Sequence, residues 1–174
     1  EVLRCCNNSL HNQAFSLISP ILGPFSCLIE LDLSDNKIGL DPFGVPNSEN
    51  TREVCLVLSQ THTLERLYLA RNHLSSEDIC FISEAIQILP RLNLLDITNN
   101  DLNETGMPAL SQALQSHTNL KGKYGLKTLL MGSNPIGNNG LDLLSSALQI
   151  NDTLTILDIS NCGYRSTSLL KLQE

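Results

Sequence analysis

One eleven-residue pattern recurs along this chain of 174 residues and constrains its fold more than any other feature. At residues 92–102 the sequence LNLLDITNNDL has apolar residues at its first, fourth, sixth and last positions and Asn at its ninth. The pattern starts again at Leu28, Leu64, Leu126 and Leu154, the last copy with Cys162 in the Asn position, and a truncated copy occupies residues 3–10. Six copies predict stacked repeats, each of which completes the hydrophobic core of its neighbours.

The spacing between copies indicates what each repeat contains. From the truncated copy onward, the copies start 28, 36, 28, 34 and 28 residues apart, which leaves room for one strand and one helix per repeat. The alternating apolar positions of each copy predict strands near residues 2–6, 29–33, 65–69, 93–97, 127–131 and 155–159. The segments between them have apolar residues at helical spacing, with a small residue where a helix must approach the sheet closely, as in Gly106, Leu110, Ala113 and Leu114.

Polar residues before these helical segments predict where the helices begin. Ser75, followed three residues later by Asp78, has the spacing of a capping box. Asn103 and Asn139 are of a residue type that favours the N-cap position, and we expect them to cap the next two helices.

The 28-residue period, the L-x-x-L-x-L-x-x-N-x-L strand and the G-x-x-x-L-x-x-A-L helix resemble the ribonuclease-inhibitor-like class of leucine-rich repeat proteins. The resemblance implies an α/β horseshoe-shaped solenoid with a parallel concave sheet and convex helices. We expect residues 1–174 to be a single solenoid fragment of about six repeats that continues beyond both ends. The class includes ribonuclease inhibitors, the sensor arms of NOD-like receptors, GTPase-activating proteins for Ran and tropomodulins. The resemblance therefore implies a cytoplasmic protein that binds other proteins as a scaffold or sensor.

The Asn of each repeat lies where the chain leaves the strand. A side-chain amide can both donate and accept hydrogen bonds, so it can satisfy backbone groups that would otherwise be buried without partners. We expect these Asn residues to form a stacked structural ladder with no catalytic role; they are Asn8, Asn36, Asn72, Asn100 and Asn134.

The residues between the leucines face the opposite side of the sheet, because side chains alternate along a strand. Aligning the repeats gives one outward column of Arg4, Asp32, Tyr68, Asp96, Leu130 and Asp158. A second column contains Val2, Glu30, Arg66, Leu94, Thr128 and Ile156. Tyr and Arg are enriched at binding hot spots, so we expect a partner to bind around Tyr68, with Arg66 beside it and Asp96 one repeat away. The alternative is a sheet face that is merely solvated.

Two insertions interrupt the 28-residue period. Residues 39–46, GLDPFGVP, follow the second strand and have the composition of a rigid loop. Residues 121–126 precede the fifth strand and belong to the only basic cluster of the chain, which contains Lys121, Lys123, Tyr124 and Lys127. We expect the two insertions to project from opposite edges of the solenoid. They are either partner-binding edge loops or tolerated surface variation.

Composition excludes several classes of partner. The net charge of −7 disfavours nucleic acid, whose phosphates require a basic surface. No apolar run approaches the ~20 residues that a membrane-spanning helix requires. The six cysteines fit thiols buried in a reducing compartment better than disulfides, with Cys5 and Cys162 in inward positions and Cys27, Cys55 and Cys80 in or beside helical segments.

The sequence contains no phosphate-binding loop, metal-protease or C-x-x-C motif, so we expect no enzymatic activity, cofactor or metal. One alternative is a GTPase-activating protein for a Ran-like partner. That activity would need an exposed polar or basic residue on a loop between a strand and a helix, and Arg71 is the candidate.

Overall fold

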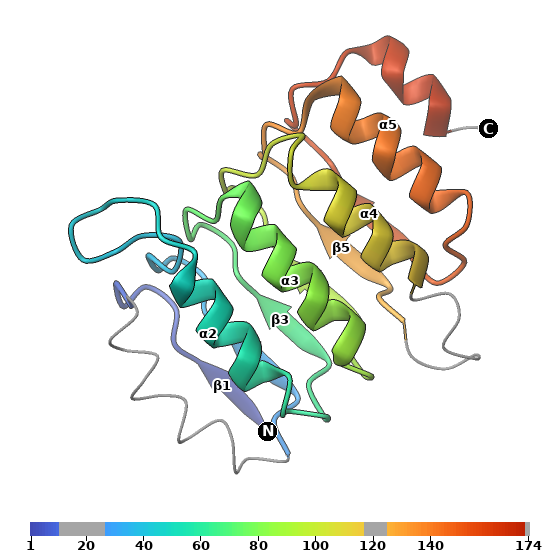
Figure 1. Ribbon diagram of the computed structural model, residues 1–174. Coiled ribbons are helices and arrows are strands. Elements are labelled where there is room, and N and C mark those ends of the chain that lie inside the picture. Colours follow the sequence, from blue (N-terminus) through green and yellow to red (C-terminus); the bar gives the residue numbers. More distant parts are fainter. Residues whose placement is uncertain (11–26, 117–124, 173–174) are drawn as a thin grey trace.

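The strands form a six-stranded parallel sheet in which they follow one another in chain order (Figure 1). The computed structural model describes residues 1–10, 27–116 and 125–172. The strands are β1 (Val2–Arg4), β2 (Glu30–Asp32), β3 (Arg66–Tyr68), β4 (Leu94–Asp96), β5 (Thr128–Leu130) and β6 (Ile156–Asp158). Each strand has three residues and lies inside the range in which the repeat spacing predicts a strand.

The helices cover one face of this sheet (Figure 1). They are α2 (Glu49–Leu58), α3 (Ser76–Ile88), α4 (Met107–Ser116), α5 (Gly137–Leu148) and the 3₁₀ helix η2 (Ser166–Leu172). Each packs against the next in chain order, and the sheet stays open. The predicted fold class, an α/β leucine-rich repeat solenoid, is confirmed. Within the described ranges, the longest of these helices falls short of the length and apolar character needed to cross a membrane.

The apolar positions of the repeated pattern form the core between the sheet and the helices. In the four complete inner repeats these side chains are at most 4% exposed; they are Leu28, Leu31, Leu33, Ile38, Leu64, Leu67, Leu69, Leu74, Leu92, Leu95, Ile97, Leu102, Leu126, Leu129, Met131 and Ile136. The corresponding residues of the end repeats, such as Leu3 and Leu157, are half-buried. Each repeat therefore depends on its neighbours for burial.

Small residues allow the helices to pack closely. Ala85, Ala113 and Ala147 are buried, as their place in the helical pattern predicts. A Cβ atom on Gly106 would lie 2.3 Å from Cγ2 of Ile79, so α4 needs glycine at this contact with α3.

The helix starts match one of the three expectations. At α3, Ser75 Oγ accepts a hydrogen bond from the Asp78 N–H and the Asp78 carboxylate accepts one from the Ser75 N–H, which confirms the capping box. Asn103 Oδ1 accepts a hydrogen bond from the Thr105 N–H in the turn that leads into α4, but α4 begins only at Met107, so Asn103 is not its N-cap. The prediction for Asn139 was wrong, because α5 already begins at Gly137 and Asn139 lies in its first turn.

The cysteines are less uniformly buried than the sequence suggests. Cys55 and Cys162 are buried and Cys5 is half-buried, but Cys27 and Cys80 are exposed, which corrects the expectation for these two. Burial raises the pKa of the Cys55 thiol to about 12. None of the six cysteines, all of which lie in the described residues, forms a disulfide.

Candidate protein-binding face

We call the sheet face opposite the helices the concave face, and the strand register arranges its residues in two columns. One column runs Arg4, Asp32, Tyr68, Asp96, Leu130, Asp158, and the other runs Val2, Glu30, Arg66, Leu94, Thr128, Ile156. Both columns match the repeat alignment. Neighbouring strands of a sheet lie about 4.8 Å apart, so Tyr68 is flanked by Asp32 and Asp96 at that spacing, whereas Asp158 lies three strands away.

A charged network occupies the first three strands of the concave face. Glu30 is 8% exposed and accepts hydrogen bonds from Arg4 Nη2 at 2.7 Å and from Arg66 Nε at 2.8 Å. These bonds, the one from Arg66 first, lower the pKa of the Glu30 carboxyl. The network is internal to the chain, so the two arginines already have an anionic partner. The repeat alignment places Arg4, Glu30 and Arg66 on this face but does not indicate that Glu30 bonds both arginines.

The aspartates of the first column also have a structural bond. Asp32, Asp96 and Asp158 each accept, through Oδ1, a hydrogen bond of 2.9 Å from the backbone N–H two residues later. This structural role was not predicted from the repeat alignment, although the sequence contains a signal for it. Each of these aspartates is followed two positions later by Ser or Thr, whereas Tyr68 and Leu130 are followed there by Ala and Gly. One oxygen of each carboxylate thus stabilises the turn after its strand. The other oxygen of Asp32 and of Asp96 accepts no hydrogen bond from the described residues, whereas hydrogen bonds from the backbone and then the side chain of Ser160 lower the pKa of the Asp158 carboxyl.

Tyr68 lies at the centre of this surface with its side chain half-buried. Burial, and then the charge of Glu30, raise the pKa of its hydroxyl, so Tyr68 is neutral at pH 7. Within the described part of the chain the hydroxyl makes no hydrogen bond. Beyond Tyr68 the columns become more apolar, with Leu94 and Leu130 half-buried and Ile156 55% exposed.

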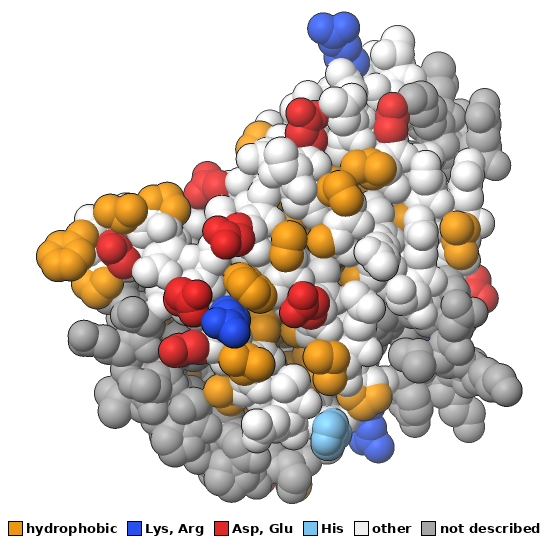
Figure 2. Space-filling view, viewed as in Figure 1, with side chains coloured by type: hydrophobic (Ala, Val, Ile, Leu, Met, Phe, Trp, Pro, Cys, Tyr) orange, Lys and Arg blue, Asp and Glu red, His pale blue; other side chains and the backbone are white. Residues whose placement is uncertain are grey.

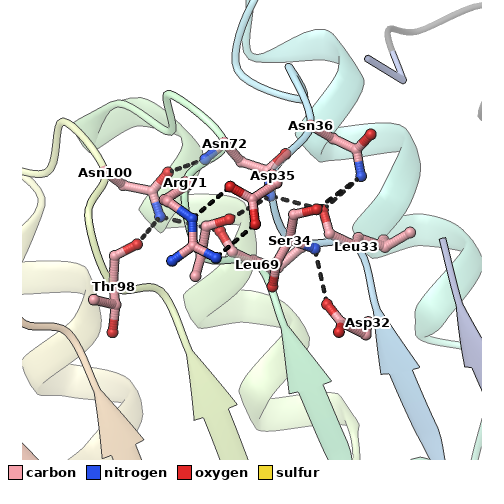
Figure 3. Close-up of polar contacts among 11 residues, drawn as sticks. Asp32, Leu33, Ser34, Asp35, Asn36, Leu69, Arg71, Asn72, Thr98 and Asn100 are labelled. Atoms are coloured by element: carbon pink, nitrogen blue, oxygen red, sulfur yellow. Dashed lines mark hydrogen bonds and ion pairs between the residues drawn. The ribbon is translucent and has the colours of Figure 1, made fainter. Parts of the chain in front are cut away.

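The Asn ladder lies at the end of the strands, beside the concave face (Figure 3). Asn100 Oδ1 accepts hydrogen bonds from the N–H groups of Asn72 and Leu74, and its Nδ2 donates to the carbonyls of Leu69 and Ile97. Asn36, Asn72 and Asn134 are likewise buried and bond backbone groups of their own and adjacent repeats.

The two ends of the ladder differ from its middle. Cys162 takes the last position, where its thiol lies 3.4 Å from the Met131 carbonyl and can donate to it. Asn8 is exposed, and its Nδ2 donates to the Cys6 carbonyl of its own repeat. The inner Asn side chains therefore bond the preceding repeat through both Oδ1 and Nδ2, whereas this bond of the Asn8 side chain stays within its own repeat.

The residue before each ladder position has a left-handed backbone conformation. These residues are Asn7, Asp35, Arg71, Asn99, Ser133 and Asn161, with φ between 54° and 58°. Arg71 and Asp35 occupy this position in adjacent repeats, and the Arg71 guanidinium donates to both carboxylate oxygens of Asp35 (Figure 3). These hydrogen bonds lower the pKa of the Asp35 carboxyl. The candidate residue for GTPase activation is therefore paired within its own chain.

The two edge loops differ in what the structure describes. Lys121, Lys123 and Tyr124 lie outside the described residues, whereas Lys127 is described and exposed at the start of β5. The loop at residues 39–46 lies between β2 and α2 and projects from the edge where the strands end (Figure 1). In the part of the chain that the structure covers, no three His, Cys, Asp or Glu residues are grouped closely enough to hold a metal ion.

Comparisons with known proteins agree with this architecture. A family model described as "Leucine Rich repeat" matches residues 26–41. The NACHT, LRR and PYD domains-containing protein 3 of Rattus norvegicus is 30% identical over 95% of this chain. The alignment covers 17% of that protein, so the chain spans about a sixth of the length of this relative.

Two solved structures share the fold. The tropomodulin C-terminal domain of Caenorhabditis elegans superposes with a TM-score of 0.66 and 16% identity, over 91% of this chain and 89% of the other. The structure of leiomodin-1 actin-binding site 2 has a TM-score of 0.61 and 12% identity, over 92% and 84%. Together with the repeats and the solenoid itself, these similarities show that the chain belongs to the leucine-rich repeat family.

Proposed function

We propose that this chain is a non-enzymatic protein-binding module, all 174 residues of which form one solenoid unit. Its partner binds the concave face, centred on Tyr68, and reaches the edge loops. The solenoid acts as a scaffold or sensor, and the free thiols support a cytoplasmic location, because such thiols persist in reducing compartments.

The observation that carries this proposal is the uncovered apolar part of the concave face. All the described helices lie on the opposite face (Figure 1). Tyr68, Leu94, Leu130 and Ile156 therefore have no covering element among the described residues, and they lie on four successive strands, alternating between the two columns. Repeat solenoids use such extended concave surfaces for binding. The leiomodin-1 structure, which shares this fold, is that of an actin-binding site, so the fold is compatible with binding a protein.

The charged groups of the concave face contribute more to the choice of partner than to the strength of binding. Arg4, Glu30 and Arg66 already satisfy one another, so a partner gains little by replacing these bonds. Asp96 keeps one carboxylate oxygen free of the turn bond, and neither Asp96 nor Asp158 forms a salt bridge with the described residues. A partner with apolar groups flanked by Lys or Arg would therefore match this part of the face.

A pull-down from cell extract, analysed by quantitative mass spectrometry, tests the proposal. The test variant combines Tyr68→Ala with Asp96→Asn, because Asn keeps the oxygen that accepts the Thr98 N–H. A control variant, Glu53→Ala, changes an exposed residue of α2 on the opposite face. We expect the double variant to lose proteins that the wild type and the control retain. An identical set of retained proteins would refute binding at the concave face, and faster GTP hydrolysis by added Ran would contradict a non-enzymatic role.

A further inference from the structure

The insertion at residues 39–46, which we call the finger, is a closed hairpin. Leu40 and Pro46 form an antiparallel bridge, and the Asp41 N–H donates to the Val45 carbonyl at 2.8 Å. Asp41 Oδ1 accepts hydrogen bonds from the N–H groups of Phe43 and Val45 at 2.8 and 2.9 Å. The shape of the finger is therefore set by its own bonds before any partner is present.

The base of the finger is bonded to the solenoid. The Gly39 N–H donates to the Asn72 carbonyl at 3.0 Å, which links the finger to the next repeat. Asn50, which is fully buried at the start of α2, donates from Nδ2 to the Leu40 carbonyl at 2.9 Å. A finger held at both its tip and its base loses little conformational entropy on binding.

The tip of the finger is apolar and projects into solvent. Phe43 is 90% exposed and Val45 is 56% exposed, the first of these being the most exposed large hydrophobic residue described. Hydrophobic side chains cluster at the end of the projecting loop (Figure 2). An aromatic side chain presented in this way on a preformed hairpin is suited to insert into an apolar groove.

The described residues contain a groove of matching size and character between α2 and α3. Its volume is about 210 Å³, and its apolar lining includes Leu56, Phe81 and Ile88. Leu56 and Ile88 are 58% and 53% exposed, so this apolar surface is open to solvent. Small-molecule pockets usually span about 300–1,000 Å³, so the groove suits a single large side chain better than a ligand. Figure 2 shows a basic side chain among the hydrophobic ones on this convex side.

We propose that the finger of one copy of this chain inserts Phe43 into the α2–α3 groove of a second copy. The finger of the same chain does not fill the groove, because Phe43 remains 90% exposed. One charged residue of the groove suits the docking: Arg52 lines the groove from α2, together with Glu84 from α3, and Asp41 at the base of the finger has one carboxylate oxygen that accepts no hydrogen bond in the described residues. Among the described residues, the Arg52 side chain otherwise makes only an exposed contact of 3.5 Å to Glu49, so it is available to pair with Asp41.

The contact has consequences for assembly that differ from the concave-face proposal. It uses the convex side and one strand-end loop, so it leaves Tyr68 and its neighbours free for another protein. One side chain in one groove is a small interface, which predicts weak association that depends on protein concentration. Because the finger and the groove are different surfaces, removing either one should abolish the contact.

Sedimentation equilibrium of the 174-residue chain tests this proposal. We expect the wild type to self-associate at high concentration, and Phe43→Ser or Leu56→Glu to lower the association constant by about tenfold or more. Matched controls on exposed apolar residues elsewhere, Ile150→Ser and Leu143→Glu, should behave as the wild type. Circular dichroism checks that every variant is folded.

Mixing the two test variants is the most specific measurement. The Phe43→Ser chain keeps its groove and the Leu56→Glu chain keeps its finger, so the mixture should form pairs although each variant alone is monomeric. A wild type that stays monomeric would overturn the proposal. Undiminished association of either variant, or a mixture that stays monomeric, would overturn it as well.

Discussion

Replacing Asn100 with Ala tests whether the Asn ladder holds the repeats together. The Asn100 side chain is buried and accepts hydrogen bonds from the N–H groups of Asn72 and Leu74, at 2.9 and 3.0 Å. Alanine removes this acceptor without adding bulk, so both donors would remain buried without a partner. The Leu69 carbonyl would also lose its bond from Asn100, whereas the Ile97 carbonyl keeps one from Asn134.

The expected destabilisation follows from the number of groups left unsatisfied. A buried polar group that loses its partner costs about 1–3 kcal/mol, so the two backbone donors together give about 2–6 kcal/mol. That is a large fraction of the about 5–15 kcal/mol by which domains are stable. The control is Asn8→Ala at the exposed end of the same ladder. This variant loses one solvent-exposed hydrogen bond, so we expect its free energy of unfolding to fall by less than about 1 kcal/mol.

Urea denaturation followed by circular dichroism measures both variants against the wild type. The comparison requires that the free energy of unfolding falls with urea concentration at the same slope in each variant, because a changed slope would indicate a different folded or unfolded state. If Asn100→Ala costs no more than Asn8→Ala, the side-chain bonds between repeats contribute little. The reasoning from unsatisfied donors would then be wrong.

Three further predictions concern other parts of the solenoid. The pKa of the Glu30 carboxyl is lowered in the folded chain, so ionised Glu30 stabilises the fold above the ordinary carboxyl pKa, and this stabilisation is lost as the pH falls through the lowered pKa. Glu30→Gln should therefore reduce the stability of the fold at pH 7 and make stability fall less steeply in acid. Thermal melts at a series of pH values measure both effects. Cys55 has a pKa of about 12 and is buried, so it should resist alkylation at pH 8 in the native chain while the exposed Cys6 reacts, as read by mass spectrometry; equal rates would contradict the described burial. Ser75→Ala should cost about 0.5–2 kcal/mol in urea denaturation, because it removes the capping box of α3, and Ser75→Asn should restore part of it.

The structure narrows the set of concave-face residues that are available to a partner. The sequence alone makes every outward residue a candidate, including Arg4, Asp32 and Arg66. In the folded chain, Arg4 and Arg66 bond Glu30, and one carboxylate oxygen of Asp32 accepts the Ser34 N–H while the other stays open. Tyr68 differs from these residues, because its hydroxyl makes no hydrogen bond to the described residues around it.

Much of the fold could be predicted from the sequence because repetition removes ambiguity. A single copy of LNLLDITNNDL could be a strand or part of a helix, but six copies at matched spacing require one structure that packs against itself. The alternation of side chains then determines which residues face the core and which face outward. For the same reason, the repeat alignment predicted the observed register of all six strands.

Only the tertiary structure decided which outward residues contact one another. Glu30 and Arg66 are 36 residues apart, and Asp35 and Arg71 are separated by the same interval across the first insertion. Sequence periodicity places each pair in adjacent repeats, but whether two flexible charged side chains meet depends on strand spacing, turn conformation and the neighbours on either side. The same limit applies to the finger, whose composition predicts a rigid loop, whereas the exposure of Phe43 depends on where the folded solenoid leaves room for it.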